Sequence, residues 1–245
     1  MDHKRRLAVV IAIASMSIGS PHGAEAQVYM SWNNCYGTVN ASQSLQYACD
    51  GSRDGAPFRL ALSFDQPASA ESLQSVTSTI EFRSIAPQVL PDYWRVYEAG
   101  TCRAGWFPTY APTAALVGSP VYCPNPLPGQ TFAYQFAFSE DPTRLLSFQA
   151  SMGTTLVPLQ GGKRYSAGVV SVDPVGDLDC TGCDQAICIQ VAFMDLITTA
   201  TFPRGPRLHG GNPESFVTWQ GPPGICPGAT TTRNRTWGTV KSLYR

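Results

Sequence analysis

The chain has 245 residues, of which 43% are hydrophobic and 14% are charged, with 17 Lys+Arg against 17 Asp+Glu. This length allows a sizeable core, and the balanced charge, with no cluster of cations after residue 26, argues against nucleic acid as a partner. The 22 glycines and 20 prolines fall mostly between apolar runs, where they mark loops rather than disorder.

Residues 1–26 have the pattern of a secretory signal peptide. Three cations at 4–6 precede an uncharged apolar run from Leu7 to about Gly19, and Ala24-Glu25-Ala26 supplies a cleavage site. The run is shorter than the ~20 residues of a membrane-spanning helix, and glycine and proline residues end it, which disfavours an uncleaved anchor. We therefore expect a mature chain from Gln27 onward, residues 27–245, with no membrane span.

Alternation of apolar and polar residues predicts strands in chain order at 58–64, 76–83, 132–138, 145–150, 165–169, 187–193, 216–220 and 236–243. In the first strand Phe58, Leu60, Leu62 and Phe64 are expected in the core, with Arg59 and Ser63 facing solvent. Residues 91–99 fit a short helix or a strand equally well. The pattern predicts an all-β, single-domain fold, an antiparallel β-sandwich of jelly-roll type that disulfides staple together.

All eight cysteines follow the signal peptide: Cys35, Cys49, Cys102, Cys123, Cys180, Cys183, Cys188 and Cys226. An even set in an exported chain predicts four disulfides and no free thiol. Spacing alone suggests Cys35 with Cys49, Cys102 with Cys123, and the last four among themselves. The alternative is a zinc site formed by the group Cys180, Cys183, Cys188 and His209, which an oxidising compartment disfavours.

Most common enzyme signatures are missing from the sequence. His209 is the single histidine of the expected mature chain, and there is no Gly-x-Ser-x-Gly, HExxH, Walker A or GxGxxG motif. Glycoside hydrolysis needs only two carboxylates, and the candidates on a β scaffold are Glu81, Glu98, Glu140 and Glu214. Nothing in their spacing selects a pair, so surface carboxylates are the alternative.

Two further groups of residues are candidates for ligand binding. The acidic segment with Asp173, Asp177, Asp179 and Asp184 can wrap a structural calcium ion, although its spacing fits no EF-hand and an acidic turn is the alternative. No other cofactor is expected. The aromatic residues Tyr93, Trp94, Trp106 and Tyr110 can stack on sugar faces if they are exposed in a row, and core filling is the alternative.

Several segments together resemble a group of uncharacterised secreted bacterial proteins. They are Cys180-Thr-Gly-Cys-Asp-Gln-Ala-Ile-Cys-Ile, Phe216-Val-Thr-Trp-Gln-Gly and Thr236-Trp-Gly-Thr-Val-Lys-Ser-Leu-Tyr-Arg, with Trp32-Asn-Asn-Cys and Thr101-Cys-Arg. The resemblance implies export, a bacterial source and a cysteine-stapled β fold. It does not identify a catalytic residue in this chain.

From these observations we expect a secreted or cell-surface protein without enzymatic activity, either a structural subunit or a binding module. The periplasm is an alternative location. Its partners would be a glycan or other copies of itself. The alternatives are a carbohydrate-binding, lectin-like domain and a glycoside hydrolase that uses a carboxylate pair.

Export predicts the residue at which the mature chain begins. Mass spectrometry of the protein released by its native host should find a chain that begins at Gln27, because signal peptidase cuts after a small-x-small sequence. A secreted chain that retains the apolar run 7–19 would contradict this interpretation.

Overall fold

A computed structural model describes the backbone of residues 27–50, 57–66, 70–86, 89–105, 108–111, 121, 123–125, 127, 130–174, 180–198 and 207–227. Within it, the side chains of residues 70–72, 130–141 and 154–155 are not described. The predicted signal peptide, the predicted strand at 236–243 and Trp106 lie outside these residues. Among the described residues, no helix is long and apolar enough to cross a membrane.

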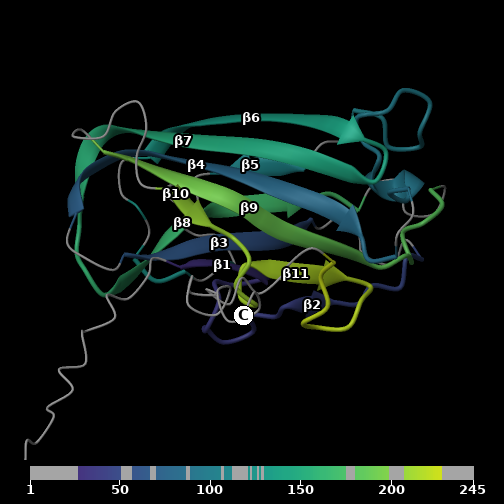
Figure 1. Ribbon diagram of the computed structural model, residues 1–245, viewed down its shortest axis with the longest axis horizontal. Helices are drawn as coiled ribbons and strands as arrows, with labels where there is room; N and C mark the ends of the chain where they lie inside the picture. Colours follow the sequence, from purple (N-terminus) through teal and green to yellow (C-terminus); the bar gives the residue numbers. More distant parts are fainter. Residues whose placement is uncertain are drawn as a thin grey trace, which may run out of the picture.

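The protein is a β-sandwich of two sheets (Figure 1). The four-stranded sheet has the order β1-β3-β8-β5, from strands β1 (Val28–Trp32), β3 (Phe58–Gln66), β8 (Lys163–Val172) and β5 (Thr109–Ala111). The larger sheet runs β2-β11-β9-β4-β7-β6, with β10 paired to β9. Its strands are β2 (Ser44–Leu45), β4 (Ala70–Ser84), β6 (Gln130–Asp141), β7 (Arg144–Leu159), β9 (Ile187–Thr198), β10 (Arg207–His209) and β11 (Phe216–Trp219). The pairings between these strands are antiparallel except that of β11 with β2.

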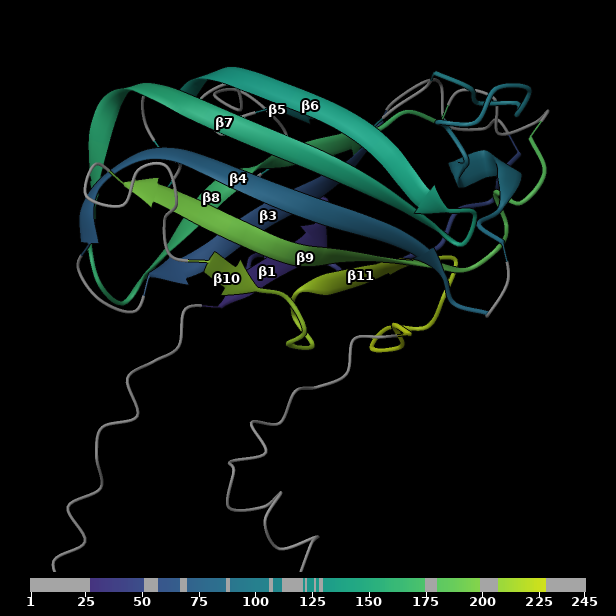
Figure 2. The same cartoon turned by 45° about the horizontal axis from the view of Figure 1, so that its top comes forward.

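The large sheet arches over the smaller one, and its long strands β4, β7 and β9 bend along the way (Figure 2). Register shifts accompany this bend, for example between Thr79 and Ile80 where β4 pairs with β9. A β-bulge inserts an extra residue and increases local twist, which lets a long strand follow the curved core. The predicted all-β sandwich is therefore confirmed.

The core between the sheets contains an aromatic cluster centred on Trp219 of β11. Its ring lies 4.8–6.1 Å from five others, and it is fully buried. The neighbours are Trp32, Tyr47, Phe58, Tyr93 and Trp94. The indole N–H of Trp219 donates to the Cys183 carbonyl at 2.6 Å, so its one polar group is satisfied inside the core.

The alternation in β3 is confirmed on its core side only. Phe58, Leu60, Leu62 and Phe64 are all buried, as predicted. Ser63 is buried too, which corrects the expectation that it faces solvent. The far side of the small sheet is covered, because Cys35, Val121 and the half-buried Cys123 pack there on Ala61 and Val169.

The segment 91–99 is neither the expected helix nor the alternative strand. It contains one 3₁₀ turn, η1 (Asp92–Trp94), followed by further turns up to Gly100, whose φ of +89° suits glycine. Tyr93 and Trp94 in this turn are drawn into the core, and burying two large rings outweighs regular backbone hydrogen bonding.

Four disulfides are present and no described cysteine is free, as predicted. The pairing suggested by spacing is wrong: the bridges are Cys35–Cys123, Cys49–Cys183, Cys102–Cys180 and Cys188–Cys226. The sandwich brings together loops that are 38 to 134 residues apart in sequence, so nearness along the chain is no guide to pairing. Only the bridge from Cys188 to Cys226 falls within the group of four that was expected to pair internally.

Removing the Trp219 ring should destabilise the fold strongly. We expect Trp219→Ala to lower the free energy of unfolding by about 3–5 kcal/mol, because it leaves a large cavity and a buried carbonyl without its donor. Urea unfolding under non-reducing conditions measures the change. Val39→Ala, at a side chain that is 80% exposed, is the control and should change it by less than about 0.5 kcal/mol.

Candidate functional site

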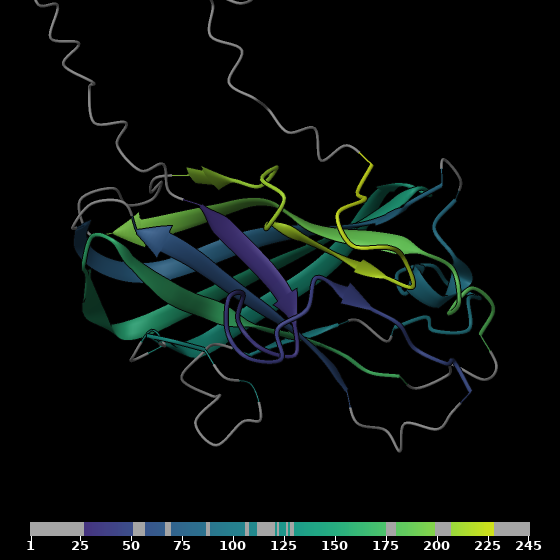
Figure 3. The ribbon, with the colours of Figure 1, turned by 90° about the horizontal axis from the view of Figure 1, so that it is seen from below.

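The loop that follows β1 is closed into a compact unit. The Trp32 backbone N–H donates to the Ser42 carbonyl at 2.7 Å, and the Ser42 N–H donates back to the Trp32 carbonyl at 3.2 Å. Residues 33–41 thus leave and return at the same point, which is the geometry of an Ω-loop, a type of surface loop that frequently carries function. Figure 3 shows this loop beside β1 and β2.

Hydrogen bonds within the loop fix its shape. The Asn34 side-chain amide donates to the Val39 carbonyl at 2.6 Å, and the Thr38 hydroxyl donates to the Cys35 carbonyl at 2.6 Å. Asn33 and Asn40 have φ of 68° and 64°, which asparagine tolerates better than most residues. The loop therefore holds its conformation through its own side chains.

Arg164 of β8 anchors the loop to the small sheet. Its guanidinium donates to the Tyr36 carbonyl at 3.0 Å and to both carboxylate oxygens of Asp65, at 2.8 and 3.2 Å. The same group lies over the ring of Tyr29, 3.7 Å from its centroid. Gly37 has φ of +79°, and a Cβ there would stand 3.3 Å from Arg164 Nη1, so glycine suits this contact. On its other side, the loop is tied down by the Cys35–Cys123 disulfide.

This anchor shifts the pKa values of its members. Burial opposes ionisation of Asp65, but the hydrogen bonds from Arg164 and Tyr29, with the Arg164 charge, outweigh it and hold the pKa of Asp65 below its ordinary value of 3.8. Burial, together with the hydrogen bond to Asp65 and its charge, raises the pKa of Tyr29 to about 12. At neutral pH the anchor thus consists of an ion pair beside a neutral phenol.

A pocket of about 350 Å³ opens between the loop and β1. Its lining consists of Ser31, Tyr36, Gly37, Thr38, Ala41, Ser42 and Gln43. Every polar side chain in it is a hydroxyl or an amide, and none is charged. Such a pocket can hydrogen-bond an uncharged ligand, and it contains no acid, base or nucleophilic thiol of its own.

The Tyr36 ring gives the pocket one aromatic surface. It stacks on Tyr29, with centroids 5.2 Å apart and planes 19° from parallel, and it lies 5.5 Å from the Arg164 guanidinium. The side chain is only partly buried. A half-exposed ring held from behind is suited to stacking on a flat apolar face of a ligand.

The candidate carboxylates of a glycosidase have separate partners. Glu81 is buried and accepts hydrogen bonds from Arg83, Arg144 and the Gln190 amide. Glu98 pairs with Arg95, and Glu214 accepts from Asn212 at 3.0 Å. The side chain of Glu140, in β6, lies outside the described residues. These contacts show three carboxylates with separate partners, and the glycosidase hypothesis stays a prediction.

The described members of the proposed aromatic row do not form a platform. Tyr93 and Trp94 are buried in the core, which corrects the expectation that they could stack on a sugar. Tyr110 is half-buried on β5 and donates to the Ala167 carbonyl at 2.9 Å. Tyr93 and Trp94 fill the core because burying the large apolar area of their rings stabilises the fold.

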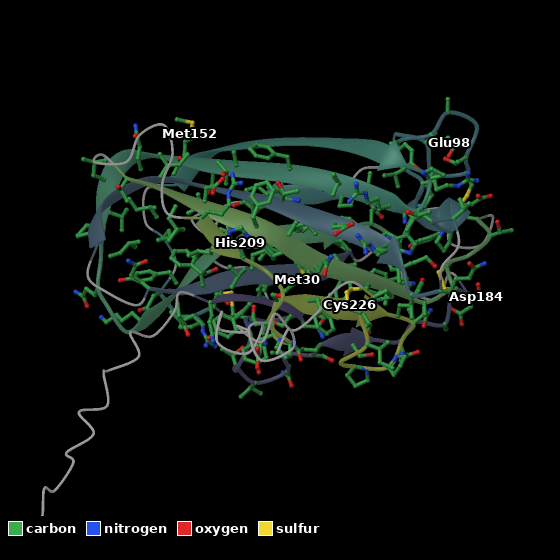
Figure 4. The ribbon with its side chains drawn as sticks, viewed as in Figure 1. Met30, Glu98, Met152, Asp184, His209 and Cys226 are labelled. Carbon is green, nitrogen blue, oxygen red and sulfur yellow. A yellow bond between two sulfur atoms is a disulfide. The ribbon has the colours of Figure 1, made fainter. Side chains whose placement is uncertain are left out.

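The described residues form neither the zinc site nor a calcium site. Cys180, Cys183 and Cys188 each belong to a different disulfide, which rules out the zinc site, and His209 is exposed on β10. Within the part of the chain that the structure describes, no three His, Cys, Asp or Glu side chains are arranged to hold a metal ion. Asp177 and Asp179 lie outside that part, so the calcium hypothesis, which also includes Asp173 and Asp184, stays a prediction. In Figure 4, Asp184 and Glu98 lie at one end of the sandwich, far from His209.

No protein-family model matches the chain, and no curated protein is significantly similar to it in sequence. The resemblance to secreted bacterial proteins therefore stays a prediction. The pocket itself was missed by the sequence analysis. The signal available was the run Trp32-Asn-Asn-Cys-Tyr-Gly, in which turn-forming Asn and Gly residues follow an apolar stretch.

The ion pair of Asp65 makes a pH-dependent contribution to stability. Since the pKa of Asp65 is lower in the folded than in the unfolded state, its contribution is full above the unfolded value of about 4 and is lost as the pH falls through the folded value. We expect Asp65→Asn to destabilise the protein at pH 7 and to have a smaller effect at pH 3. Urea unfolding at both pH values measures this, and an equal effect at the two would contradict the assignment.

Proposed function

We propose that this protein is an exported binding protein without enzymatic activity. It holds an uncharged, hydroxyl-rich ligand of the carbohydrate class in the pocket between β1 and the loop 33–41. The observation that carries the proposal is the pocket lining, in which hydroxyl and amide groups surround one aromatic ring. Sugars present the same combination of hydroxyl groups and flat C–H faces.

Export is supported by two independent observations. The N-terminal charge pattern is that of a signal peptide, and four disulfides indicate an oxidising, extracytoplasmic environment. Release from the cell or display on its surface is part of the proposal.

The rigidity of the loop supports binding. Ordering a flexible loop around a ligand costs affinity, whereas a loop already fixed by hydrogen bonds, a disulfide and the Arg164 anchor avoids that cost. The volume of about 350 Å³ lies at the small end of the range for ligand pockets, which suits roughly one or two sugar rings.

A glycan array probed with the full mature chain tests the proposal. Once a glycan is found, titration calorimetry should show that Tyr36→Ala weakens its binding by roughly tenfold or more, because the stacking surface is lost. Ala41→Gln should also weaken it by filling the pocket while keeping the Tyr36 ring. Val39→Ala is the matched control, since Val39 belongs to the same loop but does not line the pocket.

An array without binding, or binding that both pocket variants leave unchanged, would refute this function. Thermal unfolding of each variant shows whether the fold is kept. Because Ala41→Gln leaves the contacts of Tyr36 with Tyr29 and Arg164 in place, it separates a blocked pocket from a damaged loop.

A further inference from the structure

Strand β7 has its apolar and polar sides reversed along part of its length. Ser147, Gln149 and Ser151 face the interior and are fully buried. The residues that alternate with them on the outer side are apolar: Leu146, Phe148, Ala150, Met152 and, further along, Leu156. We refer to these five residues as the apolar strip. Met152 and Leu156 are 48% and 49% exposed, Phe148 and Ala150 are half-buried, and Leu146 is 8% exposed.

Two of the inward polar side chains, Ser147 and Gln149, form hydrogen bonds within the sandwich. The Gln149 amide donates to the Ser147 hydroxyl at 2.9 Å, and the Ser78 hydroxyl donates to the Gln149 carbonyl oxygen at 3.0 Å. A register slip of one residue would bury the apolar strip but break these bonds. The orientation of β7 is therefore well determined, and its apolar side is left facing outward.

The neighbouring strand β6 continues the strip in register. Phe132, Tyr134, Phe136 and Phe138 pair with Met152, Ala150, Phe148 and Leu146. Paired residues of an antiparallel ladder belong to the same side of a sheet. Exposed apolar side chains such as Met152 and Leu156 on the outer side of a sandwich mark a surface that another segment covers.

The chain after β11 approaches the strip on the same outer side of the large sheet, from its opposite edge. Residues 220–227 leave β11, and the Cys188–Cys226 disulfide fixes them on the outer side of β9. The Arg83 guanidinium of β4 then donates to the Pro227 carbonyl at 3.4 Å. Arg83 pairs with Arg144, the first residue of β7, so Pro227 lies next to the start of the apolar strip. Figure 4 shows Cys226 near β11 and Met152 well away from it, near β7.

The remaining segment, 228–245, has the length and the composition to cover the strip. At ~3.3 Å per residue it can extend over roughly 59 Å, whereas the strip from Leu146 to Leu156 spans roughly 33 Å. It carries the apolar residues Trp237, Val240 and Leu243. It also has four cations and no carboxylate, while residues 27–227 have ten cations against fifteen carboxylates. The segment and the rest of the mature chain therefore attract one another.

We infer that residues 228–245 dock on the apolar strip of the same molecule, with Trp237, Val240 and Leu243 against the outer side of β7 and β6. A second copy is a weaker candidate for this surface, because the Cys188–Cys226 disulfide already holds the start of the segment on the same sheet, which gives it a high effective concentration there. The inference is independent of the pocket on the other sheet.

Trypsin cleavage of the full mature chain at Arg233 and Arg235 tests the docking. We expect Met152→Asp, which charges the strip, and Trp237→Ser, which removes the largest apolar group of the segment, each to speed this cleavage at least about tenfold. This is the factor expected from losing one buried apolar side chain. Val39→Asp places the same charge on an exposed residue away from the strip and should leave the cleavage rate as in the unsubstituted chain.

Mass spectrometry of the fragments gives the rates and an internal control. Arg59 and Arg164 lie in strands β3 and β8, and their persistence uncut shows that a variant is folded. Cleavage of the unsubstituted chain as fast as that of Met152→Asp would overturn the inference. Protection that increases with protein concentration would also overturn it, because it would assign the surface to a second copy.

Discussion

The contact between Trp32 and Trp219 is the constraint on which the rest of the structure depends. Trp32 ends β1 in the small sheet and Trp219 ends β11 in the large one, so their packed rings, 6.1 Å apart, fix the two sheets relative to each other. The Trp32 indole donates to the Thr218 carbonyl at 3.0 Å, which sets the register of this contact. Since the Trp32 backbone also closes the loop onto Ser42, the buried pair determines where the pocket begins. A displacement of either ring would therefore disturb the core and the binding loop together.

Two disulfides add to the stability that the aromatic cluster provides around η1. Cys49–Cys183 and Cys102–Cys180 join loops around η1, where the sheets would otherwise open to solvent. Between these bridges, the buried guanidinium of Arg103 lies 4.2 Å from the centre of the Tyr93 ring and donates to the Asp173 carbonyl. A buried cation is costly unless it has such partners, and cross-links over 78 and 134 residues greatly reduce the freedom of the unfolded chain. Together they hold loops that have little regular structure.

Local pattern predicted the long strands and failed where the fold joins distant segments. The alternation from Phe58 to Phe64 predicted β3, because one buried face is enough to define a strand. β1 was missed, although its core residues Val28, Met30 and Trp32 alternate with Tyr29 and Ser31, because five residues are a short pattern. The disulfide pairing and the anchoring of Tyr36 by Arg164 join positions 38 to 134 residues apart, which spacing along the chain cannot show. The Asn and Gly residues of the loop indicated turns, but the pocket arises only when Trp32 and Ser42 meet.

The reversed pattern of β7 shows why alternation alone does not assign a face. Alternation along a strand shows only that two sets of side chains point to opposite faces of the sheet. Packing against the other sheet decides which set is buried. In β3 the apolar set is buried, whereas in β7 the set with Ser147 and Gln149 is buried and forms its own hydrogen bonds. Because β7 belongs to the large sheet and the pocket loop is anchored on the small one, the aromatic core lies between the two surfaces. A ligand in the pocket and a segment on the strip therefore do not compete for the same residues, and one protein can carry both.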